Sequence, residues 1–151
     1  MIAIVGANVG ANKFQRAIQM TWKGTSFSVV IVGVIGLFFS IYPELWSGLF
    51  TSDLQTKVTA KAYLNLVAPF YAFFALGLGL YFVCQAFNTL FWPVVGTFLR
   101  LFYVVILTLI FFYNNLASPY LLFFTMSSGL IIYGLFTVSY THLRAHETYK
   151  D

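Results

Sequence analysis

Arg100 is the residue of this sequence whose type and position most need a chemical explanation. It is the one charge inside a long apolar segment, and it follows Pro93 by seven residues. At 1.5 Å per helical residue, that spacing places it about 10 Å into an apolar helix. A guanidinium in hydrocarbon is costly unless it is paired or reaches an interface. We predict a structural pairing role for Arg100 inside a membrane, with snorkelling toward the near interface as the alternative.

Aromatic and amide side chains in the preceding segment could contact a ligand. Tyr63, Tyr71 and Tyr81 offer hydroxyls and ring faces, and ring faces attract cations. Gln85 and Asn88 add amide groups where this segment turns into the next. We expect Tyr71, Gln85 and Asn88 to line a substrate cavity.

The sequence lacks the residue patterns that catalysis or metal binding requires. His142 and His146 are four residues apart, but the zinc motif that places a glutamate directly after the first histidine is absent. The single cysteine, Cys84, lies in an apolar run and is expected to pack there. No nucleophile and base, and no convergent acids, point to a reaction. We predict no catalytic residues, no metal site, no cofactor and no enzymatic activity.

Composition places the chain in a lipid bilayer. Its 151 residues are 60% hydrophobic, 21% aromatic and 8% charged, which leaves too few polar side chains to cover a soluble globule. The net charge of +4 is modest and speaks for membrane orientation more than for a nucleic-acid partner. We predict an all-α fold, a polytopic transmembrane bundle of four membrane-spanning helices.

Four apolar runs are long enough to cross the hydrocarbon core, which needs about 20 residues. In the second, Pro69 and nearby glycines could break the helix, as at transporter binding sites, or produce an ordinary kink. In the first run, Gly36 and Ser40 could allow another helix to approach closely, or they could simply be residue types that are frequent in membrane helices. The predicted crossings are residues 24–43, 62–84, 93–113 and 119–137.

Charges at the ends of these runs set an orientation. The segment before the first crossing holds Lys13, Arg16 and Lys23 and no acid, whereas the next connector balances two lysines with Glu44 and Asp53. The positive-inside rule therefore predicts a cytoplasmic amino-terminal segment. Ser52 or Asp53 is expected to cap the following helix. A role of Asp53 as a coupling-ion ligand is the weaker alternative, because Asp53 lies outside the apolar run.

The last residues are expected to differ in origin from the rest of the chain. Residues 138–148 resemble the translation of a common sequencing adapter, and they contain both histidines of the chain. We therefore predict one partial domain over residues 1–137, followed by a non-native tail that is excluded from reasoning about the fold.

Several short motifs, in order, resemble the second half of the multidrug and toxic compound extrusion (MATE) transporters. The similarity covers roughly residues 5–136, and the arginine in the next-to-last span favours the second half over the first. The matching pieces are Val5-Gly-Ala-Asn-Val-Gly-Ala, Arg16-Ala17, Leu49-Phe-Thr-Ser-Asp53, Ala62-Tyr-Leu64, Phe73-Phe-Ala-Leu-Gly77, Gln85-Ala-Phe-Asn88, Pro93 and Leu99-Arg100.

This resemblance implies two six-helix lobes and a multi-pass protein of the inner (plasma) membrane. Such transporters export cationic or amphipathic compounds in exchange for sodium ions or protons. The four crossings would be the last four helices of the carboxy-terminal lobe and would pack against the missing helices of the same transporter. The family's intramembrane acids have no counterpart here, because Glu44 and Asp53 lie in a connector. The coupling-ion site is therefore expected in the missing part.

Two other functions stay open at this point. A lipid-linked saccharide flippase of the same superfamily would be expected to place several cationic residues in its cavity, and only Arg100 is available. A small scaffold subunit, complete with four spans, is the other alternative.

Overall fold

The computed structural model describes the backbone of residues 1–147 and the side chains of residues 1–141. Over this range the chain forms helices and no strands, which confirms the predicted all-α fold. The helices are α1 (Ile2–Gly10), α2 (Phe14–Ile41), α3 (Pro43–Phe50), α4 (Leu54–Val67), the 3₁₀ turn η1 (Ala68–Phe70), α5 (Tyr71–Ala86), α6 (Phe91–Tyr113) and α7 (Pro119–Glu147).

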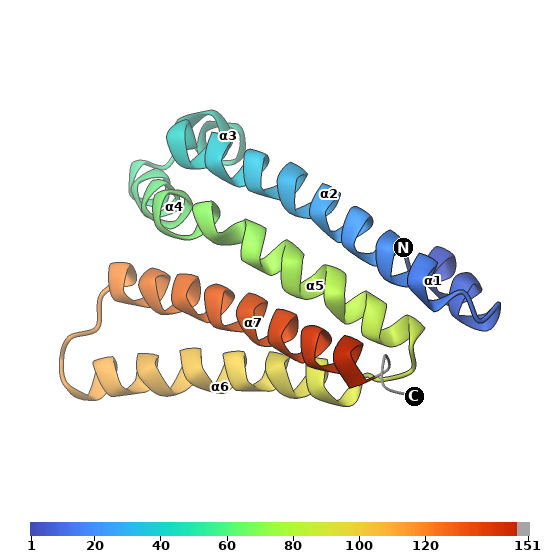
Figure 1. Ribbon diagram of the computed structural model, residues 1–151. Coiled ribbons are helices and arrows are strands. Elements are labelled where there is room, and N and C mark those ends of the chain that lie inside the picture. Colours follow the sequence, from blue (N-terminus) through green and yellow to red (C-terminus); the bar gives the residue numbers. More distant parts are fainter. Residues whose placement is uncertain (148–151) are drawn as a thin grey trace.

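The four long helical segments lie side by side in the order α2, α5, α7 and α6 (Figure 1). Helix α1, the α5–α6 turn and the end of α7 lie at one end of this layer, and α3, α4 and the α6–α7 loop lie at the other (Figure 1). Successive segments therefore run in alternating directions. Four of them in the described part are long and apolar enough to cross a membrane: Phe14–Ile41, Leu54–Ala86, Phe91–Tyr113 and Pro119–Thr141. The chain is a multi-pass membrane protein.

Each of the four helical segments extends beyond its predicted crossing at one end or both, and the first and last do so at their outer ends. Helix α2 begins at Phe14, ahead of the predicted crossing, because the basic segment that precedes the apolar run is helical and continues into it. It ends before Pro43, which disfavours helix in the preceding residue but fits the first turn of α3. Helix α7 continues through Val138–Thr141, so the first residues of the predicted tail are helical. The predicted origin of residues 138–151 stays a prediction, and residues 148–151 lie outside the described residues.

Asparagines end three of the helices. Asn12, Asn88 and Asn115 have φ values of 56°, 57° and 55°, the left-handed region that asparagine tolerates better than most residues. The next amide after each turns back to a carbonyl of the preceding helix, as Thr89 N does to Cys84 O at 2.9 Å. These turns satisfy the last carbonyls of α1, α5 and α6 and reverse the chain in few residues.

The second crossing is broken at η1. Pro69 has no N–H, so the helix cannot continue its regular hydrogen bonds there. The hydroxyl of Ser127 on α7 lies 2.7 Å from the carbonyl oxygen of Leu66 and 2.8 Å from that of Phe123, so its hydrogen bond is shared between the helix near the break and its own helix. A Cβ at Gly36 would overlap the carbonyl oxygen of Ala68, so α2 approaches the break at backbone distance. Gly36 is thus a close-approach site, the first of the two interpretations that the sequence allowed.

Helix α5 is the centre of the layer. Small residues on α5 and α7 admit large groups from the facing helices: Gly77 faces the ring of Tyr133, Gly79 faces Thr25 and Gly134 faces Phe73. The hydrophobic effect does not drive helices together in lipid, so close van der Waals packing of this kind is what holds membrane helices together. Helix α6, in contrast, contacts α7 along one side and leaves most of its apolar surface exposed.

Candidate substrate cavity

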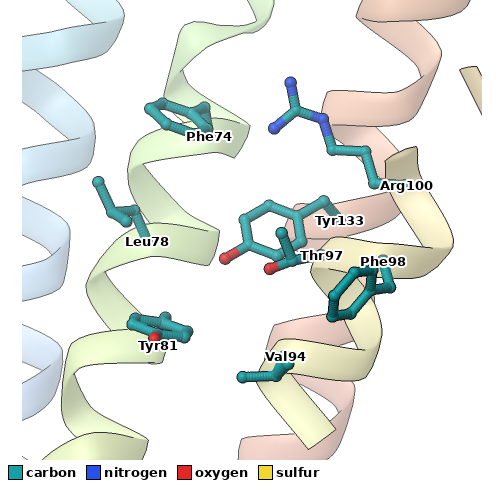
Figure 2. A pocket seen from close by; sticks show the side chains of 8 residues that line it. All are labelled: Phe74, Leu78, Tyr81, Val94, Thr97, Phe98, Arg100 and Tyr133. Carbon is teal, nitrogen blue, oxygen red and sulfur yellow. The ribbon is translucent and has the colours of Figure 1, made fainter. Parts of the chain in front are cut away.

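A cavity of about 350 Å³ lies between α5 and α6, with α7 behind it. Figure 2 shows its lining: three residues come from α5, four from α6 and one, Tyr133, from α7. We call it the α5–α6 cavity. Its lining residues are Phe74, Leu78, Tyr81, Val94, Thr97, Phe98, Arg100 and Tyr133.

Arg100 is the charged residue of the α5–α6 cavity. Its guanidinium carbon lies 5.6 Å from the ring centre of Phe74 and 6.0 Å from that of Tyr133. Both distances are within the range of a cation–π interaction. Its aliphatic stem passes over α7 at Gly129, where an added Cβ would be 3.4 Å from Cγ of Arg100. The guanidinium of Arg100 is thus held between the ring of Phe74 on α5 and the ring of Tyr133 on α7.

Carboxylates do not pair with Arg100 within the part of the chain whose side chains are described. There, the ion pair is Lys61 with Glu44, in the α3–α4 region at the end of the bundle. The predicted pairing role of Arg100 stays a prediction, and its neighbours are aromatic rings, a partner type that the sequence did not identify.

Tyr133 forms the back wall of the cavity and is only 4% exposed. Its ring can occupy this place because residue 77, which faces it on α5, is glycine. Tyr133 and Phe74 were missed by the sequence analysis, since nothing local marks two aromatic residues so far apart as neighbours. The one available signal was the glycine, which marks a close approach but does not say by which residue.

The three predicted cavity residues lie elsewhere. Tyr71 donates its hydroxyl to that of Tyr63 at 3.0 Å, near the break in the second crossing. Gln85 is exposed near the end of α5, and Asn88 is exposed in the α5–α6 turn, where its positive φ gives it a conformational role. None of the three lines the α5–α6 cavity, whereas Tyr81 does. Their contact with a substrate stays a prediction.

Asp53 is the N-cap of α4. Its carboxylate accepts hydrogen bonds from Thr56 N at 2.7 Å and Thr56 Oγ1 at 2.6 Å. These bonds, the hydroxyl first, hold the pKa of Asp53 below its usual value. The pKa of Glu44 is also lowered, by the hydrogen bond from Lys61 at 2.6 Å and by the charge of that lysine. Both acids therefore stabilise the α3–α4 region at the end of the bundle.

Metal-binding clusters of three or more histidines, cysteines or acids do not occur among the described residues. The side chains of His142 and His146 lie outside the described residues. The described carboxylates, Glu44 and Asp53, lie between the candidate spans. The α5–α6 cavity therefore combines apolar contact, aromatic faces and one positive charge, without a carboxylate in its lining.

Comparison with known proteins identifies the family. The family model MatE matches residues 1–111, which include α1 to α5 and nearly all of α6. Neither the curated proteins nor the solved structures give a match. Members of the MATE superfamily are transporters rather than enzymes. Because the matched region covers well over half of the chain and the chain has four segments able to cross a membrane, this protein belongs to the MatE family of membrane transporters.

Proposed function

We propose that this protein acts in secondary active efflux, exporting cationic or amphipathic compounds in exchange for sodium ions or protons. The observation that carries the proposal is the MatE match across α1 to α6. The alternating course of the four long segments supports it, since a transporter must enclose its substrate path with membrane-spanning helices (Figure 1).

The position within the transporter is part of the proposal. The four crossings would be the last four helices of the carboxy-terminal lobe, packed against other helices of the same protein. Much of the surface of α6 is apolar and exposed, including Phe98, Leu101 and Phe102. Such a surface suits lipid on one side and neighbouring helices on the other.

The coupling ion would bind outside the segment described here. Within the four candidate spans the described residues include no Asp or Glu, and the acids Glu44 and Asp53 are already engaged at the end of the bundle. Lys13 and Arg16 are exposed at the start of α2, which supports a cytoplasmic amino-terminal segment in the inner (plasma) membrane.

A flippase for lipid-linked saccharides is supported less well. It would need several cationic groups along its path, and Arg100 is the one that lines the α5–α6 cavity. A four-span scaffold subunit would not account for the MatE match.

The experiment is dye efflux from cells that produce the full-length protein. The two gradients are collapsed in turn. Efflux of a cationic dye should stop when one of them, the sodium gradient or the proton gradient, is collapsed, and that gradient identifies the coupling ion. Efflux that persists when both gradients are collapsed, or no efflux above that of cells without the protein, would contradict the proposal.

A further inference from the structure

We infer that the α5–α6 cavity binds the anionic group of an amphipathic molecule, with Arg100 holding the charge. A guanidinium carries five N–H donors in a fixed planar arrangement. Within the described side chains, none of the hydrogen bonds or ion pairs uses these donors, although the side chain is half-buried in a segment that crosses the membrane. The rings of Phe74 and Tyr133 attract the positive charge but leave the N–H groups without acceptors.

An oxyanion would satisfy what the rings leave open. Carboxylate and phosphate groups accept two parallel hydrogen bonds from a guanidinium, a geometry that adds strength and direction. Figure 2 shows the guanidinium at the upper end of the cavity, near Phe74 and above the ring of Tyr133. A cationic group at this place would meet the like charge of Arg100 without a carboxylate to offset it.

The rest of the lining suits an apolar body. Leu78, Val94 and Phe98 line the cavity together with the rings, and the phenol and hydroxyl groups of Tyr81 and Thr97 are its other polar elements. The volume of about 350 Å³ lies at the lower end of the range for small-molecule sites, about 300–1,000 Å³. The apolar lining and the volume of the cavity therefore favour an amphiphile with one negative charge over a bare inorganic ion.

Depth in the membrane adds to this assignment. Arg100 follows the start of α6 at Phe91 by nine residues, which corresponds to about 14 Å along the helix. This is near the middle of a hydrocarbon core about 30 Å thick. The anion could be a solute that enters the cavity or the head group of an anionic lipid. The inference concerns binding, so it does not depend on the direction or the coupling ion of the transport proposed above.

The test is a titration of the purified full-length protein in a neutral maltoside detergent. Decyl phosphate is the anionic probe, and decyltrimethylammonium, with the same chain length, is the cationic one. Arg100→Gln removes the charge from the cavity, and Arg16→Gln removes an exposed charge from α2 as the matched control. Val94→Phe narrows the cavity and keeps Arg100, so it tests the site even if Arg100→Gln does not fold.

The expected result is that decyl phosphate binds at least about tenfold more weakly to Arg100→Gln, the factor for one charge-assisted hydrogen bond. Binding should weaken in Val94→Phe and stay unchanged in Arg16→Gln. Equal affinity in the unmodified protein and in Arg100→Gln would overturn the inference. So would unchanged affinity in Val94→Phe, or binding of the trimethylammonium probe that depends on Arg100.

Native mass spectrometry of the same preparations separates the two sources of the anion. Phosphatidylglycerol that is retained by the protein, lost from Arg100→Gln and displaced by decyl phosphate would support an anionic lipid as the occupant. Binding of decyl phosphate to protein that retains no lipid would support a solute.

Discussion

Replacing Gly77 by alanine tests the packing that shapes the cavity. A Cβ at this position would overlap Cδ1 and Cε1 of the Tyr133 ring, which is almost fully buried and has little room to move. Overpacking of this kind costs about 1–3 kcal/mol. Alanine also gains up to about 1 kcal/mol over glycine in a helix. We expect Gly77→Ala to be destabilised by about 0–2 kcal/mol.

Gly48→Ala is the matched control. Gly48 lies inside α3, and a methyl group added there would meet no atom of a neighbouring element within 4 Å, so only the helix-propensity gain applies. The difference between the two variants isolates the overpacking cost of about 1–3 kcal/mol. For a chain of this size, 1 kcal/mol shifts the midpoint of thermal unfolding by about 2–4 °C.

The assay is thermal unfolding of both variants in the same detergent. Gly77→Ala should melt about 2–12 °C below Gly48→Ala. Adding Tyr133→Leu to Gly77→Ala should recover part of this difference, since the two positions are in contact. If Gly77→Ala and Gly48→Ala melt at the same temperature, the packing of α5 against α7 described here is wrong.

Three further predictions concern the break, the α3–α4 region and the buried charge. Ser127→Ala removes the hydrogen bond to the Leu66 carbonyl and should lower the free energy of unfolding by about 0.5–1.5 kcal/mol, measured by thermal unfolding. Folding lowers the pKa values of Glu44 and Asp53, so both acids stabilise the folded protein at a pH above their ordinary pKa values. This stabilisation is lost as the pH falls through the pKa values that the acids have in the folded protein. In a variant that keeps Trp46 of α3 as its sole tryptophan, the fluorescence should change on titration from about pH 6 to about pH 3. Arg100→Ala should lower the amount of folded full-length protein several-fold, measured by fluorescence-detected size exclusion, and change the range of exported cationic compounds less.

Each of these predictions has a control and a contradicting outcome. Thr59→Ala removes a similar hydroxyl from an exposed face of α4, so equal destabilisation by Ser127→Ala would argue against a special role at the break. Lys61→Met, which removes the ion pair with Glu44, is the control for the titration. If the fluorescence does not change with pH and Lys61→Met does not change the melting temperature, the two acids do not contribute to stability. Normal abundance of Arg100→Ala would contradict its structural role.

The class of fold could be predicted from the sequence because lipid imposes simple rules. A crossing needs a long apolar run, and a charge inside one is conspicuous, so both the helices and Arg100 were found without structural information. Pro69 also marked the place of the interruption, as either a break or a kink, because a residue without an N–H disturbs a helix wherever it lies.

The cavity could not be predicted, because its walls come from three helices. Tyr71 was an equally good candidate to Tyr81 in the sequence, since both are tyrosines in the same apolar segment. Their positions separate them: Tyr71 lies beside the break and bonds Tyr63, whereas Tyr81 faces the cavity. Asn88 had an amide that suggested contact with a ligand, but its backbone conformation gives it a role in the turn.

The measurement that tests the account most directly is side-specific labelling of single cysteines in intact cells, in a Cys84→Ala background. Lys13→Cys and Gln85→Cys lie at one end of the bundle, and Ser52→Cys and Leu116→Cys lie at the other, all at exposed positions. A membrane-impermeant maleimide should label Ser52→Cys and Leu116→Cys from outside, and Lys13→Cys and Gln85→Cys only after the cells are permeabilised. Labelling of Ser52→Cys and Leu116→Cys from opposite sides, or of all four from the same side, would contradict four alternating membrane crossings.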